Sequence, residues 1–379
     1  MAKIRVLQVF TIMNRGGAES MIMNYYRKID RTKVQFDFLV HRQERAAFDD
    51  EIESLGGKIY RFNAINPLFP KKYYRNLRRF FKEHPEYSII HSHLNTFSCF
   101  PLKIASEFNI PCRIAHAHIA IDKVNLSSFL NQKESPKEIL KKLIKLQLKK
   151  RVKNDATHLF SCGKKAGNWL FGNTSFRTMN NAIDTTKFKY NEAVSAKYKK
   201  EFKLEDELVI GHIGRFVSQK NHSYLLKVFA ELLKIKPHSS LVLIGDGPLR
   251  KNLEEEALAL NIKNKTHFLG VRTDIPQLCQ MMDVFVFPSF YEGLPVTLIE
   301  AQASSLKILA SDTITNEVHL TNNIQFLSIN DSPDFWASKI VELNVDKKVD
   351  QSKEIVEANY DIVSNTKNIQ EFYMQQPNS

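Results

Sequence analysis

The chain lacks long apolar runs, paired cysteines and low-complexity segments. No apolar segment in its 379 residues approaches the roughly 20 residues that a membrane-spanning helix requires. The four cysteines are scattered and form no C-x-x-C pair, which suits a reducing compartment and provides no zinc framework. The opening MAKIRVLQVF contains Lys3 and Arg5, and no small-residue cleavage site follows it, so it predicts a strand rather than a secretory leader. These absences favour a cytoplasmic globular protein.

Positive charge is in excess, since 54 Lys and Arg face 41 Asp and Glu, for a net charge of +13. Nucleic acid, an anionic membrane and phosphorylated small molecules are the candidate partners. Residues 71–82 combine six basic side chains and four aromatics with no acid, and residues 137–153 carry eight basic side chains and one acid. Both stretches predict cationic amphipathic helices, which either lie on anionic lipid headgroups or pack on their own domain. In the second stretch the uncharged side chains near one helical face are Leu140, Leu143, Ile144, Gln147 and Leu148.

Short apolar runs alternate with helical patterns along the whole chain. Turn residues bound these runs, so they predict parallel strands with helices on both faces of each sheet. The expected strands are residues 4–10, 34–40, 57–62, 88–93, 112–118, 157–162, 208–214, 240–246, 266–270, 284–289 and 307–311.

Two such sets in succession predict an α/β protein of two doubly wound, Rossmann-like domains. We place the N-terminal domain at residues 1–178, the C-terminal domain at 179–358 and a terminal helical segment at 359–379, with a lysine-rich surface connection at 187–208. In open parallel sheets ligands bind beyond the carboxyl ends of the strands. Domains that face one another across a central cleft would bind a ligand there.

A glycine pair follows the first expected strand, in the segment TIMNRGGAESM. Gly16 and Gly17 let the backbone pass close to a ligand, and a helix N-terminus behind them provides free N–H donors for an anion. An ordinary β–α turn that uses glycine for positive φ is the alternative. The pattern is not the G-x-G-x-x-G dinucleotide fingerprint.

Two cations lie just past a strand of the second half, in GRFVSQKN. Gly214 frees the backbone there, and Arg215 and Lys220 are five residues apart. Arginine binds a diphosphate bidentately and lysine acts as a point charge, so the pair predicts a diphosphate site. The alternative is a pair of exposed surface cations.

The next two expected strands end in the same manner. LIGDGP turns at Gly245, and FLGVRTD brings the backbone groups of Val271 and Arg272 to the same edge. Main-chain hydrogen bonds at that edge can read a nucleotide base.

Two glutamates flank the helix start in PSFYEGLPVTLIEAQA. Glu292 lies in the loop after a buried strand, and Pro295 suits the first helical turn. Glu300 lies about a turn and a half into the helix. Carboxylates accept paired hydrogen bonds from vicinal hydroxyls, so one glutamate suits a hexose and the other a ribose. The N–H groups of Gly293 and Leu294 suit the phosphates between them.

This E-x7-E pattern with its G-L-P resembles the signature of retaining glycosyltransferases of family 4, which have the GT-B fold. Further motifs occur in the order and spacing of that family, and the resemblance covers almost the whole chain. They are G-G-A-E at 16–19, N-N-A-I-D at 180–184, G-R-F-x3-K at 214–220, G-D-G-P at 245–248 and F-L-G at 268–270.

The resemblance implies a role for each matched residue. Arg215 and Lys220 would stabilise the diphosphate as charge grows on it during bond cleavage. Glu292 would hold sugar hydroxyls, Glu300 the ribose, and Gly17 would let the N-terminal loop approach the donor. The resemblance also implies that the N-terminal domain binds the acceptor and the C-terminal domain binds the nucleotide sugar. In that fold the last helix crosses back onto the N-terminal domain.

The family also places a histidine near the transferred sugar, after a strand in the middle of the first domain. Here that strand ends in H-A-H, so His116 and His118 are both candidates, with His118 favoured by its distance from Pro111. His91 and His93 end the preceding strand and are weaker, acceptor-side candidates.

The resemblance implies retention without a covalent intermediate, unlike glycosidases that use two carboxylates as acid and nucleophile. The leaving diphosphate itself would take the proton of the acceptor. No D-x-D follows a strand, so neither a divalent metal nor another cofactor is implied.

We therefore expect a glycosyltransferase that moves a hexose or N-acetylhexosamine from a nucleotide diphosphate sugar, with UDP as the expected nucleotide. The R-I-A-H-A-H segment and the basic first half resemble bacterial capsule and exopolysaccharide enzymes, whose acceptors are commonly lipid-linked saccharides. This implies a cytoplasmic enzyme held peripherally on an anionic membrane. The alternatives are a GT-B enzyme like UDP-N-acetylglucosamine 2-epimerase, against which E-x7-E argues, and a nucleic-acid binder, which leaves the strand-end motifs unexplained.

Overall fold

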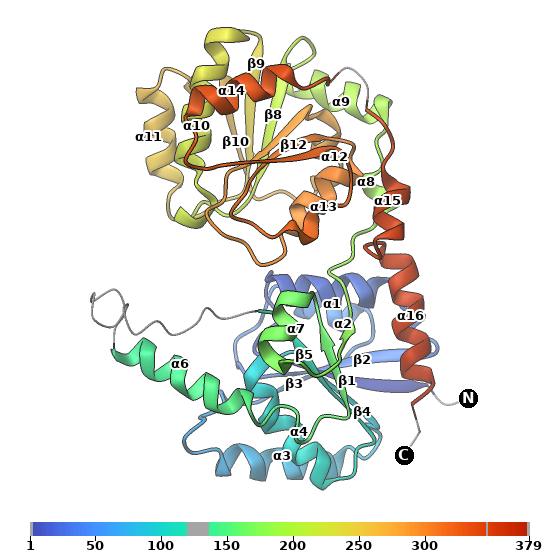
Figure 1. Ribbon diagram of the computed structural model, residues 1–379. Coiled ribbons are helices and arrows are strands. Elements are labelled where there is room, and N and C mark those ends of the chain that lie inside the picture. Colours follow the sequence, from blue (N-terminus) through green and yellow to red (C-terminus); the bar gives the residue numbers. More distant parts are fainter. Residues whose placement is uncertain (1–2, 120–135, 346–347, 377–379) are drawn as a thin grey trace. The chain divides into compact units, whose positions relative to one another are not determined.

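The chain folds into two compact units, shown as ribbons in Figure 1. The computed structural model describes residues 3–119, 136–345 and 348–376, with the side chains of the helix that begins at Pro136 described from residue 142 onward. The first unit contains residues 1–182 and 362–379, and the second contains residues 183–361. The units therefore divide at 182/183 and 361/362, rather than at 178/179 and 358/359.

The first unit is built on a seven-stranded parallel sheet in the order β3-β2-β1-β4-β5-β6-β7. The central pair is in register along its whole length, from Ile4 opposite Val34 to Phe10 opposite Val40. Such strands are buried on both faces, which explains their nearly continuous apolar sequences. The strands are β1 (Ile4–Phe10), β2 (Val34–Val40), β3 (Ile59–Arg61), β4 (Ile89–Ser92), β5 (Cys112–Ala117), β6 (His158–Ser161) and β7 (Arg177–Thr178).

Apolar cores cover both faces of this sheet. Val6 and Phe10 belong to one core, and Leu7 and Val9, which point to the opposite face, belong to the other. The last helix lies in the first unit, packs against α1 and buries Tyr373 completely. The helices are α1 (Gly17–Lys28), α2 (Asp49–Ser54), α3 (Lys71–Glu83), η1 (Asn95–Ser98), α4 (Cys99–Glu107), α6 (Pro136–Lys149), α7 (Lys164–Phe171) and α16 (Ile362–Met374).

The second unit has a six-stranded parallel sheet in the order β10-β9-β8-β11-β12-β13. Phe285 and Phe287 face one core, and Val284 and Val286 face the other. The strands are β8 (Leu208–Ile213), β9 (Ser239–Ile244), β10 (Thr266–Gly270), β11 (Val284–Phe287), β12 (Lys307–Ser311) and β13 (Ile324–Leu327).

The helices of the second unit connect these parallel strands. They are α8 (Thr185–Phe188), α9 (Glu192–Phe202), η2 (Ser218–Lys220), α10 (His222–Ile235), α11 (Arg250–Ala259), η3 (Lys263–Lys265), α12 (Ile275–Met281), α13 (Val296–Ala303), η4 (Asn316–Val318), α14 (Pro333–Glu342) and α15 (Ser352–Glu357).

Each sheet reverses its winding direction at one strand, β1 in the first unit and β8 in the second. Consecutive strands lie on opposite sides of these two strands, so the loops beyond their carboxyl ends diverge and leave a crevice. Ligands of doubly wound folds bind there. The two places to search are therefore residues 11–17 with the loops beside them, and residues 214–221 with theirs.

The prediction of two doubly wound α/β domains is confirmed, and each of the eleven predicted strands is present. The prediction missed β7 and β13, which are short edge strands with exposed positions. The segment predicted as a surface connection at 187–208 is largely exposed, and half of it forms the helix α9. The side-chain oxygen of Asn191 caps this helix by accepting from the N–H of Val194, and α9 packs against α12.

The structure also shows where the two basic stretches put their apolar side chains. The aromatics Tyr73, Phe80 and Phe81 of α3 are buried in the core of the first unit, so the apolar face of residues 71–82 packs on its own domain. In α6, Leu148 is buried while Leu143 is 51% exposed. The part of residues 137–153 before residue 142 lies outside the described side chains. Among the described helices, none has the length and apolar character needed to cross a bilayer.

Candidate functional site

Beyond β8 and β9 two glycines bring the backbones together. Gly245 has a φ of 137°, and a Cβ on it would lie 2.0 Å from the carbonyl oxygen of Gly214. The N–H of Gly214 donates to the carbonyl of Ile244 (2.9 Å), and the N–H of Gly245 donates to the carbonyl of Gly270 (2.9 Å). The carboxyl ends of β8, β9 and β10 thus form one hydrogen-bonded edge, and Gly245 is required there on steric and backbone grounds.

The loop after β11 is fastened to the same edge. The N–H of Phe290 donates to the carbonyl of Gln219 (2.9 Å), and Nε2 of Gln219 donates to the carbonyl of Tyr291 (2.8 Å). These bonds place Lys220 and Glu292 together: Nζ of Lys220 donates to Oε1 of Glu292 at 2.7 Å. The sequence analysis assigned separate roles to these two residues, so their ion pair is a contact that it missed.

The ion pair is shielded from water. The side chains of Lys220 and Glu292 are only 16% and 10% exposed, and the ammonium lies 4.7 Å from the centroid of the Phe287 ring. Low solvent exposure strengthens a charge interaction and makes it costly to remove one partner. Lys220 is therefore held at the end of β11 as a fixed positive charge.

Arg215 is the second cation of this edge. It follows Gly214 directly and is exposed. Within residues 3–119, 136–345 and 348–376 it has no hydrogen bond or ion pair to another side chain. All the guanidinium donors are thus available to an anionic ligand.

Glu300 lies on α13, which begins after Pro295. The sequence predicted Pro295 in the first turn of this helix, whereas the structure places it at the N-cap position. Burial raises the pKa of Glu300 to about 7, although the side chain keeps part of its exposure. In the described part of the chain this carboxylate has no hydrogen-bond or ion-pair partner. A desolvated carboxylate without a partner is costly, and a ligand that donates hydrogen bonds would remove that cost.

Gly293 and Leu294 precede the helix. A Cβ on Gly293 would meet no atom within 4 Å, and its φ is not in the left-handed region. The protein itself therefore does not demand glycine at this position, whereas a ligand lying against the loop would. Leu294 is half-buried and packs on the core of the second unit, so its side chain fixes the loop.

The turn after β10 presents its backbone. Gly270 has a φ of 68°, and Val271 is 65% exposed. The guanidinium of Arg272 donates to both oxygens of Asp274, at 2.8 and 2.6 Å, so it is neutralised within its own turn. Arg272 is thus placed at the predicted edge, with its backbone rather than its side chain available.

In the first unit, Gly16 and Gly17 begin α1. The N–H of Gly16 donates to the carbonyl of Asn14 (2.8 Å), and Gly16 is the N-cap residue. A Cβ on Gly17 would meet nothing within 4 Å, and its φ is ordinary. As at Gly293, nothing in the described protein requires glycine at position 17.

Four histidines at the ends of β4 and β5 form two hydrogen-bonded chains. In the first, Nε2 of His93 donates to Oε1 of Gln8 (2.9 Å), and Nδ1 of His93 lies 2.8 Å from Nε2 of His118. A neutral imidazole has a single N–H, so His93 must accept at Nδ1 and His118 must donate from Nε2. Nδ1 of His118 is left as an acceptor. Burial lowers the pKa of His118 to about 3, which keeps it neutral.

The second chain joins Tyr373, His91 and His116. Oη of Tyr373 lies 2.7 Å from Nδ1 of His91, and Nε2 of His91 lies 2.9 Å from Nδ1 of His116. His116 is fully buried, and burial lowers its pKa well below the ordinary value, whereas His118 is half-buried at the strand end. Of the two candidates in H-A-H, His118 is the one that reaches the edge of the sheet.

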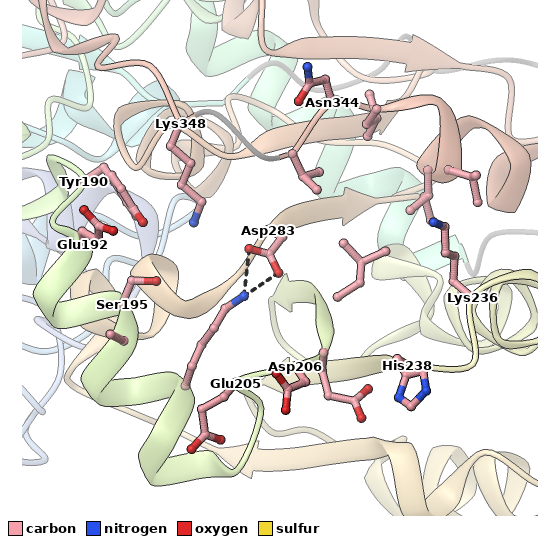
Figure 2. A pocket seen from close by; sticks show the side chains of 18 of the residues that line it. Tyr190, Glu192, Ser195, Glu205, Asp206, Lys236, His238, Asp283, Asn344 and Lys348 are labelled. Atoms are coloured by element: carbon pink, nitrogen blue, oxygen red, sulfur yellow. Dashed lines mark hydrogen bonds and ion pairs between the residues drawn. The ribbon is translucent and has the colours of Figure 1, made fainter.

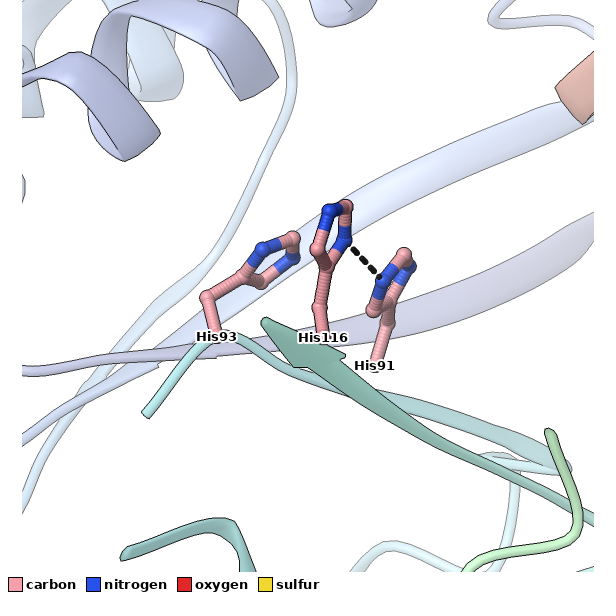
Figure 3. A group of neighbouring side chains, drawn as sticks. All are labelled: His91, His93 and His116. Carbon is pink, nitrogen blue, oxygen red and sulfur yellow. Dashed lines mark hydrogen bonds between the residues drawn. The ribbon is translucent and has the colours of Figure 1, made fainter. Parts of the chain in front are cut away.

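Ring nitrogens of His91, His93 and His116 lie within 4.8 Å of one another (Figure 3). Their neutral, buried imidazoles have the right chemistry for a transition metal. However, the rings of His91 and His93 are stacked, with centroids 4.3 Å apart and planes inclined by 22°. Imidazole lone pairs lie in the ring plane, so stacked rings do not point them at one position. The trio fits a hydrogen-bonded stack better than a metal centre.

A cavity of about 1180 Å³ lies at the opposite edge of the second sheet (Figure 2). Leu208, His238 and Asp283, which line it, mark the beginnings of β8, β9 and β11. Two of its cations are paired within the protein: Lys199 donates to both oxygens of Asp283, and Lys348 donates to two backbone carbonyls. None of the residues predicted for the site lines this cavity, so we place no chemistry there.

Comparison with known proteins identifies the family. Residues 194–361 match the profile described as Glycosyl transferases group 1. EpsF of Bacillus subtilis, named for an inferred glycosyltransferase activity, is 38% identical over 343 residues, which are 89% of this chain and 86% of that protein. The chain therefore belongs to the group 1 glycosyltransferases.

A more distant relative agrees in length, and a solved structure agrees in fold. CapH of Staphylococcus aureus, a capsular polysaccharide biosynthesis glycosyltransferase, is 26% identical over 380 residues and covers 98% of this chain and 99% of its own. The crystal structure of Anabaena HepE in complex with UDP superposes with a TM-score of 0.75 at 16% identity, over 97% of this chain and 99% of that one. The fold is GT-B.

Proposed function

We propose that this glycosyltransferase is a retaining enzyme of family 4, which moves a hexose or N-acetylhexosamine from a UDP-sugar to a saccharide acceptor. The acceptor is part of a capsular or extracellular polysaccharide. CapH, whose name refers to capsular polysaccharide biosynthesis, matches nearly the whole chain and supports this role.

The observation that carries the proposal is the set of unsatisfied groups beyond β8 and β11. Arg215 is an unpaired cation, Glu300 is an unpaired carboxylate with its pKa raised to about 7, and Gly293 leaves its backbone open. A nucleoside diphosphate complements all three, because it carries a ribose diol and two phosphates. In this proposal Glu300 accepts from the ribose hydroxyls, and Arg215 with the N–H of Gly293 binds the diphosphate.

Lys220 and Glu292 act on the transferred sugar and the bond that breaks. Negative charge grows on the diphosphate as the glycosidic bond lengthens, and the preorganised ammonium of Lys220 stabilises it. The remaining oxygen of Glu292 accepts from sugar hydroxyls. Since Arg215 and Lys220 supply positive charge at the leaving group, no divalent metal is required in this scheme.

Glu292 is an unsuitable nucleophile, because Lys220 holds it as an ion pair at 2.7 Å. We therefore propose that no covalent glycosyl-enzyme forms, and that the acceptor attacks on the face that the leaving diphosphate departs from. The diphosphate oxygen takes the acceptor proton. This gives retention of the anomeric configuration.

Uracil is the base that we propose at the edge beside β10. The HepE complex contains UDP, and in this chain the turn at Val271 presents backbone groups while Arg272 is neutralised by Asp274. Thermal unfolding with UDP, GDP, ADP and CMP in the presence of EDTA tests this step. A ligand at 100 times its dissociation constant stabilises the native state by about 2.7 kcal/mol. A rise with UDP alone is expected, and no rise with any nucleotide would refute the donor site.

We further propose a peripheral, cytoplasmic location on anionic membrane and a lipid-linked acceptor. Leu68 and Phe69 are 64% and 75% exposed just before α3, whose exposed face carries Lys71, Lys72 and Arg75. Apolar side chains next to cations favour anionic headgroups. Replacing Leu68 and Phe69 by serine should reduce sedimentation with vesicles containing phosphatidylglycerol, whereas serine at Leu258, which is 66% exposed in the second unit, should not. Equal sedimentation of all variants would refute the membrane contact.

A further inference from the structure

A cavity of about 310 Å³ opens at the carboxyl edge of the first sheet. Its lining includes one residue that follows each of four strands: Thr11 after β1, His41 after β2, Leu94 after β4 and Ile119 after β5. These four strands are neighbours, and β1 among them is the strand where the winding reverses. The cavity therefore occupies the crevice in which doubly wound folds bind their ligands. Its other lining residues are Arg42, Ala64, Ile65, Asn95, Thr96, Phe97 and Lys145.

The charge of this lining is purely positive. Arg42 and Lys145 contribute to it, and the lining contains no acid. Arg42 donates one N–H to the carbonyl of His41 (2.9 Å) and lies 4.0 Å from Glu44, which leaves most of its donors free. Lys145 has no hydrogen bond or ion pair anywhere in the described ranges. Two incompletely paired cations at one small cavity indicate an anionic ligand.

The rest of the lining is rigid and of mixed polarity. His41 is locked between the carbonyl of Phe10 (2.7 Å) and the hydroxyl of Tyr73 (3.1 Å), and burial lowers its pKa to about 4, so it adds no charge. Phe97 and Leu94 supply an apolar wall, and Thr11 supplies a hydroxyl. An apolar wall with a few fixed polar groups suits a sugar ring, which has apolar C–H faces and a polar rim.

We propose that this cavity is an acceptor subsite for a sugar that carries a neighbouring phosphate or carboxylate. The sugar ring lies against Phe97 and Leu94, and the anion lies between Arg42 and Lys145. The volume is at the lower end of ligand pockets, about 300–1,000 Å³, so the cavity holds one sugar with its anion rather than a longer glycan. The inference rests on the proposed function, because an acceptor is needed only if the chain transfers a sugar.

Octyl-linked probes test the proposal with the full-length protein. Octyl glucosyl diphosphate supplies phosphate, octyl glucuronide supplies a carboxylate, and octyl glucoside has neither; galactose versions of all three complete the set. We expect the charged probes to bind more tightly in calorimetry. Arg42→Gln and Lys145→Gln should each weaken the charged probes by about 10- to 100-fold, as expected for losing a charge-assisted hydrogen bond, and leave the neutral probe unchanged.

Two further variants separate a local effect from a general one. Lys150→Gln makes the same charge change at an exposed position directly after α6 that does not line the cavity, and it should bind every probe normally. Ala64→Phe, in an exposed loop, fills the cavity and should abolish binding of all probes. UDP should raise the melting temperature of every variant equally, which shows that the donor site is intact.

The outcomes are distinct. Preference for the diphosphate identifies a phosphate-linked acceptor, and preference for the glucuronide identifies an acidic sugar; both support the subsite. Three results would overturn it. The first is equal affinity for charged and neutral probes, and the second is an equal loss of affinity for the charged probes in Lys150→Gln. The third is no binding of any probe by protein that responds to UDP. A protein that does not respond to UDP contradicts the proposed donor site instead.

Discussion

Replacing Glu300 by glutamine should stabilise the protein without ligand and destroy its response to UDP. Burial raises the pKa of this carboxyl from 4.5 to about 7. Between pH 4.5 and pH 7 the carboxyl is therefore mainly protonated in the folded state and mainly ionised in the unfolded chain. At about 1.4 kcal/mol per pH unit, this rise corresponds to at most about 3.5 kcal/mol of instability above pH 7. Because the side chain keeps part of its exposure, screening by solvent reduces the figure to about 1–2 kcal/mol.

The sign follows from proton binding. A carboxyl whose folded pKa is raised destabilises the fold when it is ionised, so the penalty is absent below pH 4.5, grows as pH rises and is complete above pH 7. Glu300→Gln removes it. The melting temperature of the second unit should therefore exceed that of the unaltered protein by about 2–8 °C at pH 8, at roughly 2–4 °C per kcal/mol, and by much less at pH 5.

The assay is differential scanning calorimetry at pH 5 and pH 8, with and without UDP. Glu201→Gln, at an exposed position on α9 in the same unit, is the matched control and should change neither temperature. UDP should stabilise the control and fail to stabilise Glu300→Gln. The same stability for Glu300→Gln and the unaltered protein at both pH values would refute the assignment of an unpaired, desolvated carboxylate.

Three other substitutions test the remaining groups. Lys220→Met should lower turnover of a UDP-sugar by roughly 100-fold, because a preorganised cation at the leaving group is lost. It should also lower the melting temperature by leaving Glu292 without its partner, so adding Glu292→Gln should restore the melting temperature but not the rate. Near-normal turnover in initial-rate assays would remove Lys220 from the site. Gly293→Ala should leave the melting temperature unchanged, since a Cβ there meets nothing within 4 Å, yet weaken UDP in calorimetry by tenfold or more. Unaltered affinity would show that no ligand lies against this loop. Gln8→Leu removes the acceptor that fixes the His93 tautomer, so nitrogen NMR should show mixed tautomers at His118, and a single unchanged tautomer would contradict the proposed hydrogen-bond order.

Much of the proposed donor site was predictable because its residues follow strands directly. Gly214, Arg215, Gly245 and Glu292 stand within a few positions of apolar runs, and the carboxyl ends of parallel strands share one edge. The strand order then brings β8, β9 and β11 together. Position in the sequence and topology were sufficient for these residues.

Contacts between distant segments were not predictable in the same way. The pairing of Lys220 with Glu292 joins residues 72 positions apart and depends on how Gln219 anchors the neighbouring loop. Gln8 and Tyr373 show only as polar groups within apolar patterns, and nothing in one sequence says which histidines they meet. A signal did exist at Gln8, because a glutamine inside IRVLQVF requires a buried partner.

Amphipathic helices are a second case in which the sequence could not predict the contacts of a segment. The pattern of residues 71–82 shows that one face is apolar, but not whether lipid or protein covers it. In the structure Tyr73, Phe80 and Phe81 fill the core of the first unit, while the exposed apolar residues, Leu68 and Phe69, lie in the loop before the helix.

The position of α16 has a consequence for the order in which the protein is made. Ile369, Phe372 and Tyr373 belong to the core around β1 and β2, yet the ribosome adds them about 330 residues after the end of β2. The second unit is continuous in sequence, from residue 183 to 361, and can complete its own core first. Until α16 is synthesised, the first unit therefore keeps an apolar face exposed. A chain that ends before residue 362 should bind chaperones more than the full-length chain does.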